Sequence, residues 1–338
     1  MTKLAIVILN WNGVEMMRRF LSSVVAYSDG AEVVVVDNGS TDDSCEWLTR
    51  EYPMVRQVLL GQNYGFADGY NRGLREVKAE YYLLLNSDVE VREGWLRPML
   101  GYMDEHPEVA ACQPKLLCQW SPGNLEYAGA CGGYIDYLGY PFCRGRLFST
   151  VEADHGQYDT VAPVFWATGA ALMVRSADYW SVGGLDAYFF AHQEEIDLCW
   201  RLRSRGRGIV CVPQSVAYHL GGGTLPQGNP RKTFLNFRNN LLLLYKNLPD
   251  DRLASVMRMR FWLDALASVQ FLLTGQFKSF IAVWRARREF RRVRSQFDAV
   301  RRDNLSHTVV DAIPEMLPHS LLWQYYVKRH HRYSELDK

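Results

Sequence analysis

The stretch YYLLLNSD, residues 81–88, is the strongest fold signal in the chain. Its first five residues form an unbroken apolar run, which predicts a strand buried on both faces, as in the centre of a parallel sheet. The run ends on small polar residues and the carboxylate Asp88. Ligands of open α/β sheets bind beyond the carboxyl ends of the strands, so Asp88 is placed to hold a hard divalent cation. An ordinary Asn-Ser-Asp turn would have the same sequence.

Two similar strands are predicted earlier in the chain, at Leu4–Leu9 and Glu32–Val36, and both also end on polar residues. Between them, apolar side chains recur at helical spacing over residues 14–27, which predicts a crossover helix. A weaker strand is expected at Val55–Leu60. This alternation predicts an α/β fold with a doubly wound, mostly parallel sheet flanked by helices.

Polar loops follow these strands. In the loop of residues 37–43, Ser40 or Thr41 can cap the next helix, with Asp42 and Asp43 suiting its positive end. Capping does not explain Asp37, since a helix cap does not require a carboxylate at the end of the preceding strand. The glycine-containing loop of residues 61–73 lets a backbone approach a ligand closely, although its spacing matches neither standard phosphate-binding motif.

An acidic cluster opens a predicted helix that runs to Leu202, with Glu194, Glu195 and Asp197 in its first turn. The helix dipole stabilises acidic residues there, which is a sufficient structural explanation for one or two of them. Three like charges so close together repel one another. Because neighbouring carboxylates raise one another's pKa, the cluster also fits a general base that deprotonates a hydroxyl group.

A histidine, His219, ends a later predicted strand and precedes three glycines. A single histidine is more often structural than a ligand. The His-Gly-Gly-Gly sequence occurs in esterases, but the chain has no GxSxG motif, so hydrolase chemistry is set aside.

Composition narrows the class of protein. The chain has 338 residues, of which 48% are hydrophobic, and can bury a substantial core. Its net charge of +1 argues against a nucleic-acid partner. Seven cysteines without a CxxC pair are typical of a reduced protein, and the first apolar strand is too short for a signal peptide. We therefore expect the protein on the cytoplasmic side.

Together these motifs resemble those of inverting glycosyltransferases of family 2, which have the GT-A fold, in the bacterial rhamnosyltransferase-like branch. The agreement of several motifs in order is more specific than any one of them. The resemblance is carried by NWN (10–12), VDNGSTD (36–42), NYGFA (63–67) with Asn71 and Gly73, LNSD (85–88), GA (169–170), FF (189–190), EEIDL (194–198) and His219.

The resemblance implies a nucleotide-diphospho-sugar donor, such as dTDP-rhamnose or a UDP-sugar, with Mg²⁺ or Mn²⁺ held by Asp88 and His219. The family's DxD motif is reduced here to Asn86-Ser87-Asp88, and its usual Glu-Asp pair is Glu194-Glu195. Glu195 falls where the catalytic base sits, although either glutamate fits that role. The residues that the resemblance assigns to donor binding are Asn10, Trp11, Asn12, Asp37, Asn38, Asn63, Gly65, Asn71, Asn86 and Ser87.

Two regions are predicted: residues 1–248 as the catalytic domain, and residues 249–338 as a basic helical region. Within the second, residues 261–284 are apolar but interrupted by polar residues, which argues against a membrane span. An arginine-rich stretch, residues 285–294, follows at once. The pattern fits a helix on an anionic membrane surface, a solvated basic face or a homodimer contact.

The expected activity is transfer of a sugar to a glycan or lipid-linked acceptor in surface polysaccharide synthesis. The alternative is a catalytically silent family member that binds a nucleotide-sugar or tethers a partner at the membrane. Arg238 and Asn239 resemble a family element near the donor, but a helix-capping role fits them equally.

Overall fold

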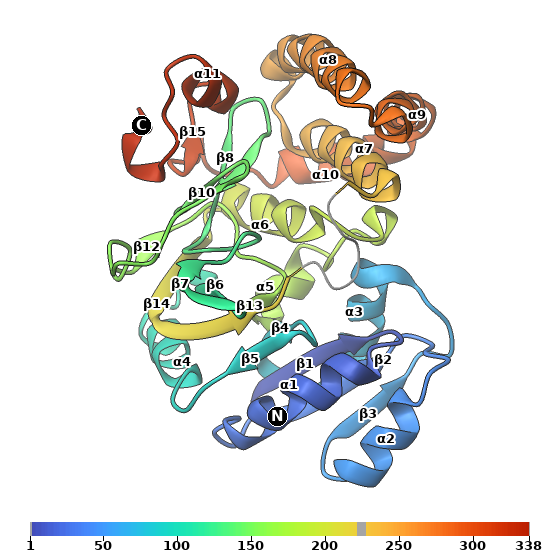
Figure 1. The fold of residues 1–338 in the computed structure, drawn as a ribbon, viewed down its shortest axis with the longest axis vertical. Helices are drawn as coiled ribbons and strands as arrows, with labels where there is room; N and C mark the ends of the chain where they lie inside the picture. Colours follow the sequence, from blue (N-terminus) through green and yellow to red (C-terminus); the bar gives the residue numbers. More distant parts are fainter. Residues whose placement is uncertain (1, 222–227, 338) are drawn as a thin grey trace.

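The computed structural model describes residues 2–221 and 228–337, and its N-terminal half contains the alternating strands and helices (Figure 1). Its elements are β1 (Thr2–Asn10), α1 (Val14–Ala26), β2 (Glu32–Asp37), α2 (Ser44–Glu51), β3 (Arg56–Leu59), α3 (Gly65–Arg75), β4 (Ala79–Leu85), β5 (Val89–Val91), α4 (Leu96–Glu105) and β6 (Val109–Cys118). Strand β1 pairs in parallel with β2 and β4, and β2 pairs in parallel with β3. The carboxyl ends of these four strands therefore meet at one edge, which confirms the predicted α/β class.

The main sheet is mixed. Its strand order is β12-β14-β6-β13-β4-β1-β2-β3, with β12 at Ala162–Pro163. Strand β13 (Ala171–Arg175) runs antiparallel to both β4 and β6. Within the stretch of residues 165–175, only residues 171–175 join this ladder. Strand β14 (Gly208–His219) is one element, and its pairing with β6 shifts register around Pro213, which has no N–H to donate.

A second, five-stranded sheet is formed mainly by residues 133–151, with one strand from near the C-terminus. It comprises β8 (Gly133–Asp136), β9 (Pro141–Cys143), β10 (Arg146–Leu147), β11 (Thr150–Val151) and β15 (Met316–Leu317). Strand β15 pairs in parallel with β8, so the end of the chain returns to this sheet. Strand β7 (Ser121–Leu125) pairs instead with β6 in the main sheet.

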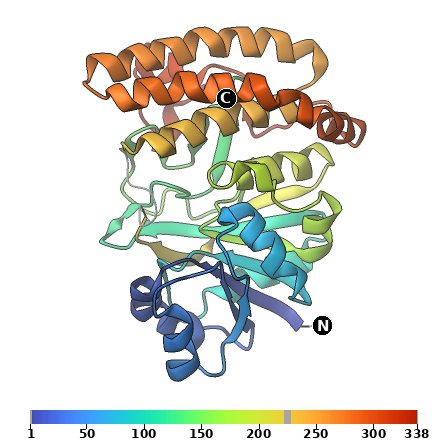
Figure 2. The ribbon, with the colours of Figure 1, turned by 90° about the vertical axis from the view of Figure 1, so that its right-hand side faces the viewer.

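Helices form the remainder of the C-terminal half. They are α5 (Ser176–Ser181), η1 (Ala187–Phe189), α6 (Glu194–Ser204), α7 (Pro230–Asn247), α8 (Asp250–Leu273), α9 (Phe277–Val293), η2 (Arg294–Phe297), α10 (Asp298–Ser306), α11 (Leu321–Tyr326) and η3 (Tyr333–Glu335). Figure 2 shows α8 and α9 as the outermost layer, at the opposite end of the molecule from β1. Among the described residues, no helix combines the length and apolarity needed to cross a bilayer.

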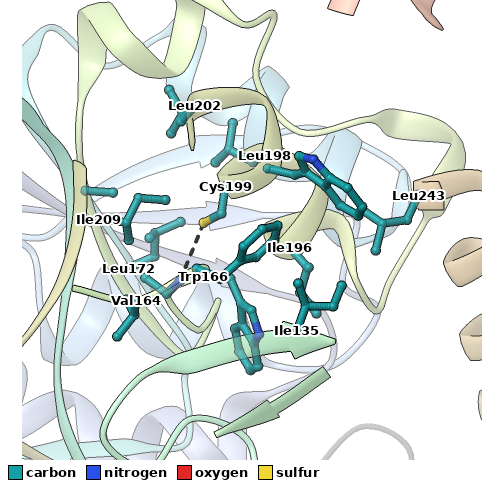
Figure 3. Close-up of a cluster of buried hydrophobic side chains, with 14 of the residues drawn as sticks. Ile135, Val164, Trp166, Leu172, Ile196, Leu198, Cys199, Leu202, Ile209 and Leu243 are labelled. Carbon is teal, nitrogen blue, oxygen red and sulfur yellow. Dashed lines mark hydrogen bonds between the residues drawn. The ribbon is translucent and has the colours of Figure 1, made fainter. Parts of the chain in front are cut away.

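The core beneath α6 holds that helix in place (Figure 3). Leu198 and Leu202 are fully buried and pack with residues of the sheet, including Leu172 and Ile209. Full burial of each such side chain contributes roughly 1.5–3 kcal/mol. The Cys199 thiol also accepts a hydrogen bond from the backbone N–H of Ala167 at 3.5 Å. The first turn of α6 is therefore positioned by a packed core rather than by a loop.

Candidate active site at the strand ends

The tips of β1 and β2 hold Asp37 in a fixed orientation. Asn10 is the parallel neighbour of Asp37, and its Nδ2 donates to Asp37 Oδ1 at 3.2 Å and to Ser40 Oγ at 3.1 Å. The other oxygen of Asp37 accepts from the backbone N–H groups of Gly39 and Ser40. Asn10 Oδ1 is buried without a hydrogen-bond partner in the described chain. That orphan acceptor lies beside Asp37 at the edge where the sequence predicts the donor.

The first two loops are joined to each other. Asn12 has a left-handed backbone (φ 50°), and its Oδ1 accepts from the backbone N–H of Thr41 at 2.7 Å. Ser40 Oγ in turn accepts from the backbone N–H of Asn12 at 2.9 Å. The predicted capping of α2 by Ser40 or Thr41 was wrong, because the cap position is Asp43 and these residues bind the first loop instead. Trp11 projects beside them with 49% of its surface exposed.

A third loop is tied to the second through Asn38. Its Nδ2 donates to the carbonyl of Gly65 at 2.9 Å, and its Oδ1 accepts from the N–H of Tyr64 at 3.0 Å. Asn63 Oδ1 accepts from the N–H of Gly65 at 2.8 Å. Gly65 has φ 79°, and a Cβ there would lie 2.4 Å from the ring of Phe190. The position therefore requires glycine for both backbone conformation and space.

Asn71 is engaged in structural contacts. Its Nδ2 donates to the carbonyl of Leu185 at 2.7 Å, while its Oδ1 accepts from the Tyr179 hydroxyl and from the N–H of Leu185. These bonds fasten α3 to the turn before η1. A sequence pattern does not distinguish this positioning role from donor contact.

Asp88 and His219, which are 131 residues apart in the chain, lie together. Asp88 follows β4 and His219 ends β14, and the Nε2 of His219 is 3.1 Å from Oδ1 of Asp88. The N–H of Leu220 also donates to the carbonyl of Asp88, which locks the two chain segments. Both side chains are buried, with 8% and 5% of the residue exposed. The structure thus unites the two residues that the resemblance assigns to the metal.

A third group, Glu126, completes this cluster and was missed by the sequence analysis. Its Oε1 lies 3.3 Å from Nδ1 of His219, and the residue is buried. Burial lowers the pKa of His219, but its hydrogen bond to the Asp88 carboxylate and the nearby Glu126 carboxylate outweigh burial and raise the pKa to about 10. Burial raises the pKa of Asp88, and the hydrogen bond and charge of His219 reverse that effect and hold it below its ordinary value. Glu126 lies in an irregular segment without periodicity, so no sequence signal identifies it.

The donor set suits a divalent cation bound partly by the protein. A carboxylate oxygen and an imidazole nitrogen meet at Asp88 and His219, and both are ligands that Mn²⁺ accepts once the imidazole has released its proton. Within residues 2–221 and 228–337 no group of three or more His, Cys, Asp or Glu side chains has metal-binding geometry. The two residues therefore fit a cation whose other ligands come from a diphosphate or water.

The glutamate pair at the start of α6 lies next to the strand-end edge. The N–H of Asn86 donates to the carbonyl of Ala170 at 3.0 Å, and a Cβ on Gly169 would lie 3.9 Å from the Cβ of Glu195. Ser87, beside Asn86, faces the first loop, since a Cβ on Gly13 would lie 3.8 Å from its Oγ. These contacts link the metal-site loop to the pair.

Both glutamates have strongly perturbed acidity. Burial raises the pKa of Glu195 to about 7. Burial and the charge of Glu195 raise the pKa of Glu194 well above its ordinary range. Oε2 of each is buried without a hydrogen-bond partner among the described residues. Asp197 differs, because it pairs with Lys246 at 2.8 Å and with Arg201 at 2.9 Å, and so has a structural role.

The loop that leads into this pair is strained and clamped. Phe190, His192 and Gln193 have φ values of 64°, 71° and 70°, which cost free energy in residues other than glycine. Nδ2 of Asn239 lies within 3.0 Å of three of the loop's carbonyl oxygens, those of residues 189, 191 and 192. Arg238 donates to the carbonyls of residues 188 and 189. Arg238 and Asn239 do not cap α7, since both lie in the middle of that helix, and both instead donate to the carbonyl of Phe189 at the end of η1.

Comparison with known proteins assigns the family. Residues 5–154 match the model named glycosyl transferase family 2. The N-terminal part of the chain, which this model matches, belongs to glycosyltransferase family 2. The chain is 28% identical over 222 residues to the N-acetylglucosaminyl-diphospho-decaprenol L-rhamnosyltransferase of Mycobacterium tuberculosis (strain ATCC 25618 / H37Rv), which covers 60% of this chain and 71% of the relative.

Solved structures agree with the GT-A fold of this family 2 member. Residues 1–349 of S. aureus TarS superpose with a TM-score of 0.53 at 15% identity, covering 90% of this chain and 89% of that one. GalNAc-T7, solved with UDP, GalNAc and Mn²⁺, gives a TM-score of 0.56 at 15% identity. That match covers 72% of this chain but only 48% of the GalNAc-T7 chain.

Proposed function

We propose that this family 2 member is an inverting, metal-dependent glycosyltransferase. It moves a sugar from a nucleotide-diphospho-sugar to a glycan or lipid-linked acceptor in surface polysaccharide synthesis. The observation that carries the proposal is the pairing of two unlike groups at one sheet edge. Asp88 and His219 form a cation-binding pair 3.1 Å apart, and Glu195 has a pKa raised to about 7 by burial and one unpaired oxygen.

The donor is proposed to be dTDP-rhamnose or a UDP-sugar. A rhamnosyltransferase among the relatives supports the first, and the UDP in the GalNAc-T7 structure supports the second. Asn10, Asp37, Asn38 and Asn63 fix the loops at this edge through hydrogen bonds to one another and to backbone groups, and we assign these loops to the base and ribose of a nucleotide. The buried, unpartnered Oδ1 of Asn10 is an acceptor for one of those groups.

Each residue then has a defined chemical task. Asp88 and His219 would hold Mg²⁺ or Mn²⁺, and the bound ion would supply Lewis-acid stabilisation of the negative charge on the departing nucleoside diphosphate. Glu195 removes the proton from the acceptor hydroxyl as that oxygen attacks the anomeric carbon. Attack from the face opposite the leaving group inverts the configuration. A pKa near 7 suits the base, because it combines a populated carboxylate with useful basicity at neutral pH.

Replacement of Glu195 by Gln tests the assignment, because it keeps the shape and removes the basicity. Turnover is expected to fall by about 10²–10⁴-fold, the usual contribution of a general base. Donor affinity, measured by calorimetry with Mn²⁺, should stay within a factor of about two. The matched control is Glu93→Gln, at an exposed glutamate, which should leave both unchanged. Wild-type turnover in Glu195→Gln contradicts the proposal.

The alternative is a catalytically silent protein that binds nucleotide-sugars or tethers a partner. Slow hydrolysis of donors in a panel with Mn²⁺ separates the two, since a silent member binds a donor without cleaving it. The presence of Asp88, Glu195 and His219 together favours the enzyme. A lipid-linked acceptor would require work at a membrane surface, and we place the protein peripherally on the cytoplasmic face of the cell membrane.

The remaining assignments are also proposals. We assign residues 1–248 to the catalytic domain and residues 249–338 to the region that contacts the membrane or a second copy of the chain. The boundary falls just before α8, although β15 and α11 return to pack beside the second sheet.

A further inference from the structure

Helix α8 has an inside-out distribution of side chains. Its buried face carries polar and charged residues, namely Arg260, Asp264 and Ser268. Its opposite face exposes large apolar residues, namely Met259 (47%), Trp262 (70%), Leu266 (67%), Val269 (47%) and Leu273 (82%). These positions are three or four residues apart, so they form one stripe along the helix. A helix that faces water normally shows the reverse arrangement.

The buried charges explain why α8 holds this orientation. Asp264 is fully buried and accepts from Arg260 at 3.2 Å and from Arg287 of α9. Arg260 also donates to the carbonyl of Leu138 at 2.9 Å and to the amide oxygen of Asn240 on α7. Turning α8 over would leave these charges unpaired or break the network, and an unpaired buried charge strongly destabilises a fold. The buried ion pairs therefore keep the apolar stripe facing outward.

Helix α9 extends the same surface. Phe277 (59%), Ile281 (42%) and Trp284 (36%) are exposed at helical spacing. Phe261 connects the two helices, because its ring lies 5.3 Å from that of Trp262 and 6.2 Å from that of Trp284, measured between centroids. The exposed apolar residues of α8 and α9 thus form one continuous patch, called the hairpin patch below.

Arginines lie directly beside the hairpin patch. Helix α9 carries six basic residues and one acidic residue, Glu289. Arg288 and Arg291 follow Trp284 on the same helical face and are exposed. In the described chain neither forms an ion pair, while Glu289 pairs with Arg292 at 2.6 Å. The patch therefore combines apolar anchors with uncompensated positive charge.

We propose that the hairpin patch docks on an anionic lipid bilayer, with α8 and α9 lying in the plane of the interface. The apolar stripe would enter the boundary of the acyl chains, the two tryptophans would lie at the headgroup level, and the arginines would meet anionic headgroups. A second copy of the chain fits less well, because self-pairing of the patch would place arginines near arginines. The outermost position of both helices leaves the surface open to a flat partner (Figure 2).

The purpose of this docking rests on the proposed function, since a lipid-linked acceptor lies in the same bilayer. The binding itself needs neither donor nor acceptor. Vesicle binding and sugar transfer can therefore fail separately, and each result is informative about one proposal only.

Flotation of the full chain with vesicles tests the docking. We expect strong binding to phosphatidylcholine vesicles that contain phosphatidylglycerol and weak binding to phosphatidylcholine alone. Leu266→Glu with Leu273→Glu should abolish the binding. Arg288→Glu with Arg291→Glu should weaken it at least about 25-fold, since each arginine near an anionic surface contributes about fivefold. The variants' nucleotide-sugar affinity and circular dichroism check that the fold is kept.

The matched control is Met54→Glu with Val309→Glu, which places the same charges at apolar residues that are 71% and 72% exposed elsewhere. This variant should bind vesicles like the wild type. Binding to neither vesicle, or unchanged binding by the Leu266→Glu and Leu273→Glu variant, overturns the proposal. If the wild type is a dimer in light scattering and binds no vesicles, and the variant with Leu266→Glu and Leu273→Glu is a monomer, the patch is a contact with a second copy of the chain instead.

Discussion

Nδ1 of His219 lies 3.3 Å from Oε1 of Glu126, on the opposite side of the imidazole from Asp88. The other oxygen of Glu126 accepts from the N–H of Ala128 at 2.6 Å, so the carboxylate is held in place. A carboxylate behind a metal-binding histidine fixes the ring and the tautomer that presents Nε2 to the metal. If His219 binds the cation as proposed, Glu126 is its positioning residue.

Replacing Glu126 by Gln should weaken Mn²⁺ binding by about 10–100-fold, the usual effect of losing such a partner. Titration of Mn²⁺ followed by electron paramagnetic resonance measures this without any turnover. Glu90→Gln is the matched control, because Glu90 lies two residues from Asp88 and bonds Gln119 rather than His219. Equal Mn²⁺ affinity in Glu126→Gln and wild type would remove the positioning role.

The pKa of Glu195 predicts how activity depends on pH. Burial raises it to about 7, so the basic carboxylate forms only as pH rises through that value. We expect kcat/KM to increase with pH and to level off above about 7, as for any base that must be deprotonated. Steady-state rates between pH 5 and 9 at constant ionic strength measure the ascending limb.

Glu194→Gln separates the two glutamates. Burial is the main cause that raises the pKa of Glu195, and Gln at position 194 leaves that burial in place. The variant should keep measurable turnover and an ascending limb near pH 7. Loss of that limb in Glu194→Gln, with its survival in Glu195→Gln, would assign the base to Glu194.

Replacement of Asp197 is expected to change the stability of the fold rather than the chemistry of the site. Its replacement by Asn should destabilise the fold by up to about 3–5 kcal/mol, because Arg201 loses its buried carboxylate and Lys246 keeps only Asp186 as a charged partner. Burial raises the pKa of Asp197, but Lys246 and Arg201 outweigh it and lower the pKa. Its stabilisation is therefore present at neutral pH and lost as pH falls below the ordinary value of 3.8. Denaturant unfolding at pH 7 measures the difference, and the exposed Asp311→Asn should change stability by less than about 0.5 kcal/mol.

Alanine substitutions at Gly65 and Gly94 test the close contact between Gly65 and Phe190 of the strained loop. Both have positive φ, 79° and 76°, but a Cβ at Gly65 meets the ring of Phe190, while at Gly94 it meets nothing within 4 Å. Gly94→Ala should cost about 1–2 kcal/mol from the backbone alone. Gly65→Ala should cost a further 1–3 kcal/mol or so from overpacking, and it should also weaken donor binding. Equal melting temperatures for the two variants would contradict this account of the loop.

Local patterns predicted the parallel half of the fold. Apolar runs that end on polar residues mark β1, β2 and β4, because a strand buried on both faces must be apolar at nearly every position. The direction of β13 was not predictable, since periodicity contains no information on which neighbours a strand pairs with. Pro213 does not end β14, because a register shift in its pairing with β6 accommodates the proline.

At the site, single residues were predicted better than their partners. The resemblance pointed to Asp88 and His219, but only the folded chain shows that Glu126 stands behind the histidine. Asn71 matches a family motif and yet bonds Leu185, because an amide that fastens a turn looks the same in sequence as one that faces a ligand. In α8, the polar residues that interrupt the apolar sequence form the buried face of the helix.

Asn240 connects the outer helices to the loop that precedes the glutamate pair. Its Nδ2 donates to the side chain of Gln193, directly before the glutamate pair, and its oxygen accepts from Arg260 of the outer hairpin. The hairpin and the proposed base therefore share one rigid support. If the hairpin rests on lipid, the height of Glu195 above the bilayer becomes a constant of the fold, and the protein would select acceptors by how far their terminal hydroxyl projects from the membrane.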